Sequence, residues 1–317
     1  MSALFLGVDT SNYTTSVSCV STEGIVFERR TMLSVPLGER GLRQSDAVFQ
    51  HVRNLPPLIE AMLGSVERDA IQAVAVSSKP TADQESYMPV FLAGKLAAVS
   101  IASSLGVPLY ETTHQAGHVR AALLGQETLV NESPFLAMHL SGGTTDLLLV
   151  HREDGMIGEI ARIGGCDDLH AGQFVDRVGV RLGLPFPSGI SLEALAREAA
   201  DHTIKLSASV KVLNCSFSGQ ESHAQRLIEA GADKSAIAYA VYDCMARTFA
   251  KLLTSAFIET GCTTALLSGG VSGSLLLREL LQQRLEKTLF YAQSGLSSDN
   301  AVGTALLARD RMEQQES

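Results

Sequence analysis

The sequence lacks paired cysteines, an uninterrupted apolar run of membrane-spanning length, and the start expected of a secreted protein. Its five cysteines are scattered and include no Cys-x-x-Cys pair, which argues against a disulfide framework or thiolate metal site and favours a reduced, cytoplasmic protein. Met88–Tyr110 is apolar, but prolines, serines and a lysine interrupt it, so we expect a core helix and no membrane association. Met1–Val8 lacks the cationic region and long apolar stretch of a signal peptide, and we expect its apolar residues to form a buried strand.

The sequence also lacks an excess of positive charge. The formal net charge is −9, and an acidic surface opposes tight, unaided binding to nucleic acid. Any role on nucleic acid would therefore need a local basic patch or a partner protein. The 317 residues are 45% hydrophobic and 19% charged, which leaves room for about two domains, each with a sizeable core.

Three turns rich in hydroxyl residues, two of which contain a Gly-Gly pair, stand at the ends of apolar runs. His139–Asp146 reads His-Leu-Ser-Gly-Gly-Thr-Thr-Asp between two apolar segments, and this pattern predicts a strand-turn-strand unit whose backbone N–H groups bind phosphate. Asp9–Ser16 repeats the design near the N-terminus, and Ser268–Ser274 follows a third apolar run and precedes a helical pattern. Each turn alone is compatible with an ordinary connection. Together they predict a duplicated fold that binds one nucleotide between its halves.

Hydrophobic periodicity predicts alternating strands and helices along the whole chain. We expect strands at 3–8, 15–20, 25–32, 73–77, 135–140, 146–150, near 156–163, 264–267 and 289–292, and helices at 46–63, 90–105, 174–184, 192–198, 236–260, 275–285 and 301–314. Hairpins followed by strand-helix units predict two α/β domains with mixed sheets and a cleft between them.

His114 and His118 are candidates for metal ligands. If Thr112 or Thr113 caps a helix here, the two imidazoles lie one turn apart on one face and can share a divalent metal, although an ordinary surface pair is the alternative. Zinc proteases with this spacing carry a glutamate directly after the first histidine, and Gln115 cannot act as that general base. A third ligand should be a carboxylate, and Asp299 is a candidate, although it also stands at the expected N-cap of the last helix.

These pieces, in this order, resemble the threonylcarbamoyladenosine synthase (TsaD-type) family of the actin, Hsp70 and sugar-kinase ATPase-fold superfamily. The resemblance covers essentially the whole chain. The matching segments are 7–11, 113–118, 140–145, 171–176, 185–189, 216–219, 268–271 and 299–301. It implies a two-lobed α/β fold with a nucleotide cleft, for which we expect an N-terminal lobe at 1–112 plus 300–317 and a C-terminal lobe at 113–299.

The resemblance also implies a set of site residues and ligands. His114, His118 and Asp299 would hold iron or zinc, and the ligand would be ATP or an AMP-containing adenylate. The expected nucleotide and substrate site consists of His139, Leu140, Ser141, Gly142, Gly143, Thr144, Asp176, Gly189, Gly269, Gly270 and Ser274, with the first loop at Asp9, Thr10 and Ser11. Asp176 would accept hydrogen bonds from ribose, although a solvated helix residue is the other interpretation. No catalytic acid or base is assigned.

The chain departs from the family pattern at several of these positions. Asn12-Tyr13-Thr14-Thr15 replaces Cys-Asp-Glu-Thr, Thr144 replaces a histidine, Gln220-Glu221 replaces Leu-Lys, and Ser274 replaces an asparagine that contacts adenine. We therefore expect the protein to be a divergent paralogue within this family.

Its expected function is metal-dependent transfer of threonylcarbamoyl from its adenylate to an adenosine of tRNA, with tRNA bound only with helper proteins. A paralogous ATPase-fold protein and a small ATPase subunit are the expected partners. One alternative is a regulatory or scaffold protein that binds nucleotide and metal. Another is a small-molecule kinase, which is a weaker candidate because Tyr13 and Thr14 offer no catalytic carboxylate.

Overall fold

The computed structural model describes residues 2–11, 13–35, 42–83, 85–130 and 132–316. Two compact units emerge: unit 1 comprises Met1–Gly125, Glu153–Gly158 and Ser298–Ser317, and unit 2 comprises Gln126–Arg152 and Glu159–Ser297. Residues 113–125, 153–158 and 298–299 thus group with unit 1, whereas the expected lobes placed them in the C-terminal half. None of the described helices is long and apolar enough to cross a membrane.

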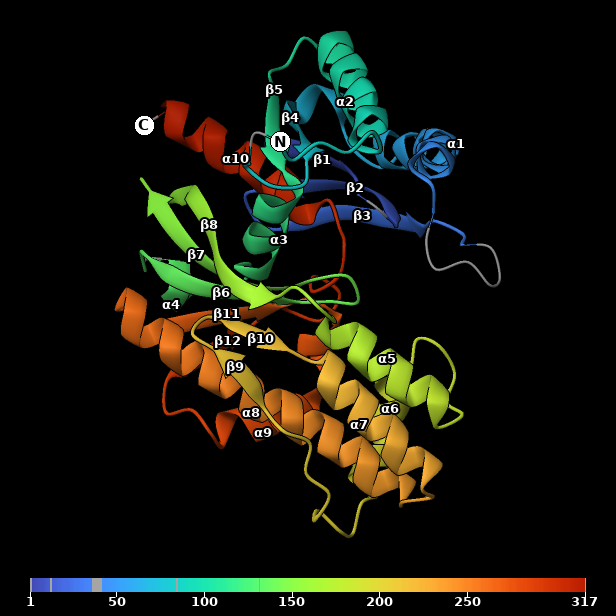
Figure 1. The fold of residues 1–317 in the computed structure, drawn as a ribbon. Coiled ribbons are helices and arrows are strands. Elements are labelled where there is room, and N and C mark those ends of the chain that lie inside the picture. The colour runs from blue at the N-terminus through green and yellow to red at the C-terminus, as the bar shows by residue number, and fades with distance from the viewer. Residues whose placement is uncertain (1, 12, 36–41, 84, 131, 317) are drawn as a thin grey trace. The chain divides into compact units, whose positions relative to one another are not determined.

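Unit 1 is built on a five-stranded mixed sheet with the strand order β3-β2-β1-β4-β5 (Figure 1). Its strands are β1 (Leu4–Thr10), β2 (Thr14–Ser21), β3 (Ile25–Met32), β4 (Ile71–Lys79) and β5 (Leu109–Thr113). Its helices are α1 (Gln44–Leu63), α2 (Phe91–Leu105), α3 (His114–Ala122) and α10 (Val302–Glu316), with a 3-10 turn at Arg68–Ala70. Strand β1 pairs antiparallel with β2 and parallel with β4, so it lies at the centre of this sheet.

The alternation of side chains along β1 assigns its residues to two differently covered faces. Leu4, Leu6 and Val8 pack in a core that is shared with buried residues of α1 and α2. Gly7 points to the other face, where an added Cβ would lie 2.4 Å from the backbone oxygen of Ala301 at the start of α10. The register therefore directs Asp9, two residues further along, to the same face as Gly7.

Helices α3 and α10 cross at a pair of glycines. A Cβ added to Gly303 would lie only 1.8 Å from the backbone oxygen of Gly117, and one added to Gly117 would lie 3.0 Å from Oγ1 of Thr304. Only glycine lets two helix backbones approach this closely. The contact fixes α3, which carries two histidines, against the segment that follows Asp299.

Unit 2 contains a seven-stranded sheet with the order β12-β11-β6-β7-β8-β10-β9. Its strands are β6 (Phe135–Leu140), β7 (Thr145–Glu153), β8 (Met156–Cys166), β9 (Ser209–Lys211), β10 (Asn214–Ser216), β11 (Thr264–Ser268) and β12 (Thr288–Tyr291). The helices are α4 (Glu127–Val130), α5 (Ala171–Arg181), α6 (Gly189–Arg197), α7 (Ser218–Glu229), α8 (Lys234–Thr260) and α9 (Leu275–Gln282), with a 3-10 turn at Gly270–Gly273.

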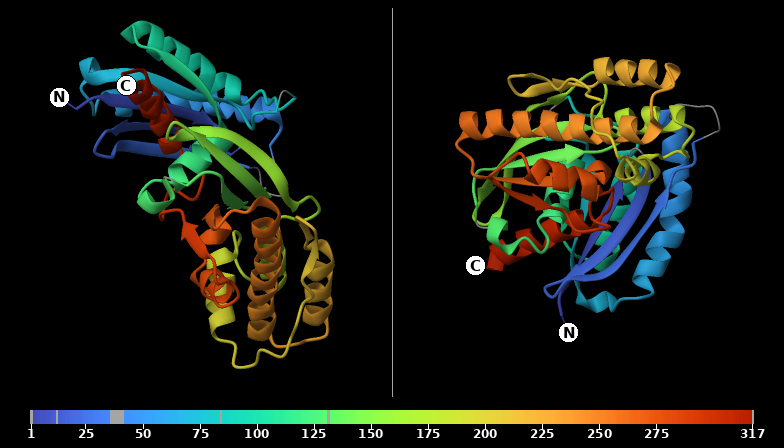
Figure 2. Two further views of the ribbon diagram at one scale, coloured as in Figure 1. Left: turned by 90° about the vertical axis from the view of Figure 1, so that its left-hand side faces the viewer. Right: turned by 90° about the horizontal axis from the view of Figure 1, so that it is seen from below.

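Helix α8 organises the core of unit 2. It is 27 residues long, is drawn in orange in Figure 2, and packs against α5, α6, α7 and α9. Tyr242 and Phe249 are among its fully buried side chains, and each large apolar side chain removed from water stabilises the fold by about 1.5–3 kcal/mol. Helix α8 begins with Asp233, whose carboxylate accepts the Ala236 N–H, and ends at Gly261 in the left-handed region (φ 74°).

Candidate functional site

Helix α3 brings the two predicted metal-binding histidines together. It begins at His114, and Oγ1 of Thr113 accepts the Ala116 N–H at 3.0 Å, so Thr113 is the cap. Nε2 of His114 and Nε2 of His118 lie 2.9 Å apart. The rings meet edge to face with centroids 4.3 Å apart, as two imidazoles separated by one helical turn can.

Asp299 completes a three-residue cluster. Its Oδ1 lies 3.1 Å from Nε2 of His118 and 3.6 Å from Nε2 of His114. Asp299 is not the cap of the last helix, because Asn300 supplies the oxygen that accepts the first N–H of α10, at Val302. Among the described residues, His114, His118 and Asp299 form a group whose ligand atoms all lie within 4.8 Å of one another, which is close enough to hold a metal ion.

The spacing of the three donor atoms fits one metal ion. Ligand atoms that bind zinc at about 2.0–2.2 Å are separated from one another by about 3.0–3.5 Å, depending on the bond angle. Of the observed separations of 2.9, 3.1 and 3.6 Å, the second lies inside that range and the other two lie at its edges, so small movements of the side chains suffice to bind one ion. Two imidazoles and one carboxylate also leave coordination positions for a substrate oxygen.

The first loop supports this cluster from the end of β1. Asp9 is 1% exposed, and its Oδ2 lies 2.8 Å from Nδ1 of His114, which leaves the Nε2 of that ring for the metal. The Ser11 N–H donates to Oδ1 of Asp9 at 3.0 Å, and the Ser11 hydroxyl donates to Asp299 at 3.3 Å. Thr10 points the other way, where its hydroxyl donates to the Val90 carbonyl at 2.9 Å. Asn12, also in this loop, lies outside the described residues.

The charges of the cluster are strongly coupled. Burial disfavours the charged form of each group, but the interactions between His114 and the two carboxylates outweigh it. The pKa of His114 is raised to about 10, whereas the pKa values of Asp9 and Asp299 are lowered. In the absence of metal, the two carboxylates therefore retain a proton on His114, and a metal ion must displace it.

This coupling predicts that metal affinity rises with pH. Because the proton on His114 leaves only near pH 10, each unit of pH between 6.5 and 8.5 should raise the apparent Zn²⁺ affinity about tenfold for one displaced proton. Calorimetry in buffers of different ionisation enthalpy counts the released protons directly. Asp9→Asn removes a charge that holds the proton and should flatten the profile. A pH-independent affinity in the unaltered chain contradicts this account.

In unit 2 the predicted turn after β6 is a tight hairpin. The Ser141 N–H donates to the Thr144 carbonyl at 2.8 Å, and the Gly143 N–H donates to the Ser141 hydroxyl at 3.3 Å. A Cβ added at Gly142 or Gly143 would meet no atom within 4 Å, so the backbone of the turn is accessible to a ligand. The N-terminus of α5 is fixed beside it, because the Gly172 N–H donates to the Ser141 carbonyl at 3.1 Å.

The second glycine turn lies beside the first. Gly269 has φ +89°, and a Cβ there would lie 2.2 Å from the backbone oxygen of Leu140. Oγ of Ser268 and Nδ1 of His139 are 3.1 Å apart, at the ends of two adjacent parallel strands. Gly270 has open space around it. Ser274 caps α9 by accepting the Leu277 N–H at 3.2 Å.

The predicted ribose residues also lie close together. Oδ1 of Asp176 accepts the Ser188 N–H at 2.7 Å, which fixes the residue directly before Gly189. The Tyr242 hydroxyl donates to the Gly189 carbonyl at 2.9 Å, and burial raises the pKa of Asp176. The segments around Asp176 and Gly189, which were predicted from the sequence, are thus linked in unit 2.

Two acidic residues, one in each unit, were not assigned a role from sequence. Asp9 was named only as part of the first loop, and Asp168 was not named. The Asp168 carboxylate accepts the Ser218 hydroxyl at 2.6 Å and the Ser218 and Phe217 N–H groups at 3.2 Å each, and it also bonds the Ser216 hydroxyl. Burial raises the pKa of Asp168, but hydrogen bonds from Cys166, Ser216 and Ser218 outweigh it and lower the pKa, and the bonds to residues 216–218 join that segment to the loop before α5. The short loop that carries Asp168 has no periodicity that signals such a role.

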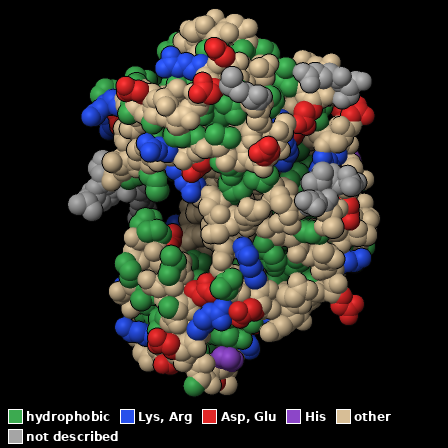
Figure 3. Space-filling view, turned by 180° about the vertical axis from the view of Figure 1, so that it is seen from behind, with side chains coloured by type: hydrophobic (Ala, Val, Ile, Leu, Met, Phe, Trp, Pro, Cys, Tyr) green, Lys and Arg blue, Asp and Glu red, His purple; other side chains and the backbone are tan. Residues whose placement is uncertain are grey.

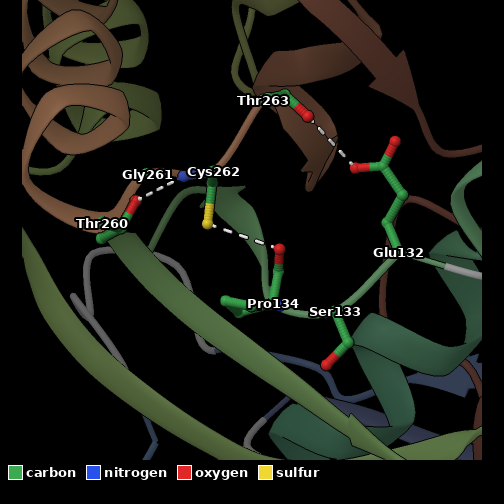
Figure 4. A pocket seen from close by; sticks show the side chains of 7 residues that line it. All are labelled: Glu132, Ser133, Pro134, Thr260, Gly261, Cys262 and Thr263. Carbon is green, nitrogen blue, oxygen red and sulfur yellow. Dashed lines mark hydrogen bonds between the residues drawn. The ribbon is translucent and has the colours of Figure 1, made fainter.

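A separate hollow of about 370 Å³ lies elsewhere on unit 2 (Figure 4). Glu132 and Cys262 are among its lining residues, and Figure 4 shows the Cys262 thiol directed at the Pro134 carbonyl. None of the predicted metal or nucleotide residues contributes to it.

Solved structures define the class of protein first. The chain superimposes on HypF of T. kodakarensis with a TM-score of 0.63, 15% identity, and coverage of 99% of this chain and 48% of that one. It superimposes on a ROK family glucokinase from Streptomyces griseus, in complex with glucose and AMPPNP, with a TM-score of 0.56, 13% identity, and coverage of 97% and 100%. The fold is therefore the ATPase-like fold that actin, Hsp70 and sugar kinases share, as predicted.

The sequence then identifies the family. Residues 37–306 match the TsaD family, which is described as tRNA N6-adenosine threonylcarbamoyltransferase. The chain is 32% identical to the tRNA N6-adenosine threonylcarbamoyltransferase of Thermus thermophilus over 311 residues, which cover 96% of this chain and 91% of the relative. The chain belongs to the TsaD family, and the resemblance seen in its motifs is confirmed.

Proposed function

We propose that this protein transfers threonylcarbamoyl from its adenylate to the exocyclic amine of an adenosine in tRNA. The observation that carries the proposal is the convergence of His114, His118 and Asp299, supported by Asp9, in a chain of the TsaD family. A bound divalent metal, iron or zinc, supplies a Lewis acid for a phosphate or acyl oxygen. The glycine turns at Ser141–Thr144 and Ser268–Gly270 bind the phosphate and acyl groups, and Asp176 binds the ribose hydroxyls.

The transfer needs no reactant other than the adenylate and the tRNA adenosine. The N6 nitrogen attacks the carbamoyl carbon, a C–N bond forms, and the C–O bond to the phosphate breaks. AMP leaves with the electron pair of that bond, and the proton that the nitrogen loses passes to solvent. Backbone N–H groups of the two glycine turns are suited to stabilise the negative charge that develops on oxygen during this step.

We further propose that tRNA binds only in the presence of partner proteins, for which a paralogous ATPase-fold protein and a small ATPase are the candidates. The net charge of −9 opposes unaided binding to a polyanion. Figure 3 shows one face of the molecule, and among the described residues on it the basic and acidic side chains are interspersed and do not form one basic patch.

The residues of the first loop affect the expected rate of threonylcarbamoyl transfer. Tyr13 and Thr14 carry no carboxyl group, and Tyr13 is exposed whereas Thr14 is buried. We propose that transfer is slow, because the absence of one positioned acid or base reduces a rate by about 10²–10⁴-fold.

Reconstitution tests the function. The full chain, loaded with Zn²⁺ or Fe²⁺, is incubated with threonylcarbamoyl-adenylate and unmodified tRNA, with and without the two partner proteins. Mass spectrometry of the tRNA nucleosides should detect modified adenosine only when metal and partners are present. A complete system that binds the adenylate but leaves the tRNA unmodified overturns the proposal.

Gly143→Val tests the phosphate-binding turn. Because no protein atom lies within 4 Å of a Cβ at Gly143, the variant should fold normally but place a branched side chain where phosphate must approach. We expect calorimetry to show AMPPNP binding weakened tenfold or more, about 1.4 kcal/mol. An unchanged melting temperature serves as the control for folding. Wild-type affinity in this variant excludes the turn as the phosphate site.

A further inference from the structure

A buried histidine of α1 faces the first loop from the side opposite the metal cluster. The buried face of α1 consists of Ala47, His51, Leu55, Leu58 and Met62, and His51 is the one ring with titratable nitrogens among these apolar side chains. Its side chain is 0% exposed. A core position in a helix otherwise filled by aliphatic residues does not by itself require an imidazole.

The hydrogen bonds of His51 attach the ring to the hairpin that carries the first loop. Nδ1 lies 2.8 Å from Oγ1 of Thr15, and that same oxygen accepts a hydrogen bond from the Asn54 side chain at 3.2 Å. The Thr15 hydroxyl can donate to Nδ1 or accept a proton from it, since its oxygen has two lone pairs, and in either case the contact ties the ring to strand β2. Burial lowers the pKa of His51, so the ring is neutral near pH 7.

Nε2 of His51 is the unusual atom. It is buried, and among the described residues it has no hydrogen-bond partner of ordinary geometry. The Ser11 carbonyl and the Asp9 carboxylate both favour a proton on this ring, although burial opposes it more strongly. A buried ring nitrogen without a partner disfavours the fold, so the ordered contact of this imidazole with the first-loop hairpin is the one that Nδ1 makes with Thr15.

The residues around His51 lead directly to the metal cluster. Thr15 is the strand partner of Thr10 in the β1–β2 hairpin, so the imidazole is attached to the base of the first loop. At the other side of that loop, Ser11 bonds both Asp9 and Asp299. Asp9 in turn orients His114.

We infer that His51 is a positioning residue for the metal centre: through its contact with Thr15 it fixes the base of the first loop, so that Asp9 and Ser11 hold His114 and Asp299 in ligating geometry. This inference rests on the proposed metal site. The residue acts through the loop and touches no ligand of the metal directly. Outer partners of metal ligands commonly affect metal affinity by about 10–100-fold.

The test measures Zn²⁺ binding to the full chain after removal of metal, together with the melting temperature. His51→Ala should raise the Kd for Zn²⁺ tenfold or more. His51→Asn keeps a polar atom near the position of Nδ1, can bond Thr15, and should recover most of the affinity. Met62→Ala removes a buried side chain from the same face of α1 and should lower the melting temperature without changing the Kd.

The outcomes separate a positioning role from a merely structural one. If His51→Ala lowers the melting temperature as Met62→Ala does but binds Zn²⁺ like the wild type, the inference is wrong. If His51→Ala does not fold, Thr15→Val carries the test, because valine has nearly the shape of threonine but lacks the hydroxyl. Its Kd should rise severalfold, and an unchanged Kd overturns the inference. A wild-type chain that binds no Zn²⁺ overturns the metal site itself, whereas unaffected variants of a zinc-binding chain overturn only the role of His51.

Discussion

Replacing both His114 and His118 with alanine should reduce the bound metal from about one equivalent to background. The two imidazoles supply two of the three donor atoms in the cluster, and a carboxylate alone holds a transition metal weakly in water. Elemental analysis of the purified protein measures the metal directly. The same variant should show no transfer to tRNA in the reconstituted system, because the Lewis acid is lost.

A matched control removes two histidines elsewhere. His202 and His223 lie in unit 2, outside the cluster, and their joint replacement by alanine changes the histidine count equally. This control should retain the metal of the wild type. Circular dichroism of both double variants distinguishes loss of ligands from loss of fold. Full metal content in His114→Ala/His118→Ala would falsify the site.

The part of this site that is predictable from sequence is the part set by local geometry. A separation of four residues places two histidines on one side of any helix, and Thr113 caps that helix as a threonine at this position is expected to do. The two glycine turns were likewise visible, because each Gly-Gly pair directly follows an apolar run that forms a strand in the structure. Their phosphate-binding role remains a prediction.

The contact between Asp9 and His114 was not predicted. The two residues are 105 positions apart, and their meeting depends on which face of β1 carries Asp9. The alternation of side chains along β1 shows which face carries Asp9 only once Leu4, Leu6 and Val8 are known to pack under α1 and α2. His51 was missed for a related reason, since one polar residue on an apolar helical face is indistinguishable from an ordinary core histidine until its partners are known.

The elements missed from sequence are those with a weak hydrophobic pattern. Helix α7 has only Gln220 and Ala224 buried, so its sequence shows little of the 3.6-residue periodicity that identifies longer helices. Strands β9 and β10 have three residues each, and β5 has five, which are too short for a clear alternation. Helices α1, α2 and α8, whose apolar residues are numerous, were predicted with small errors at their ends.

Gly303→Ala should disrupt the metal centre from a distance. In a helix, alanine normally stabilises by about 0.5–1 kcal/mol relative to glycine, so the expected sign without tertiary contact is favourable. Here the new Cβ would lie 1.8 Å from the Gly117 oxygen and 2.8 Å from the Ala121 nitrogen, both of which are backbone atoms that cannot turn away. Helices α3 and α10 must therefore separate, at a cost of about 3 kcal/mol for overpacking of this kind.

A separation of α3 and α10 moves the metal ligands because the two helices cross next to them. His118 directly follows Gly117, and Asp299 precedes Gly303 by four residues, so any shift between the helices changes the 3.1 Å distance between His118 and Asp299. The melting temperature should fall by about 6–12 °C, and the Kd for Zn²⁺ should rise tenfold or more. Gly219→Ala in α7 is the matched control, since a Cβ there meets no atom within 4 Å, and it should leave both quantities nearly unchanged. A Gly303→Ala protein with wild-type stability and zinc affinity would show that the two helices do not set the spacing of the ligands.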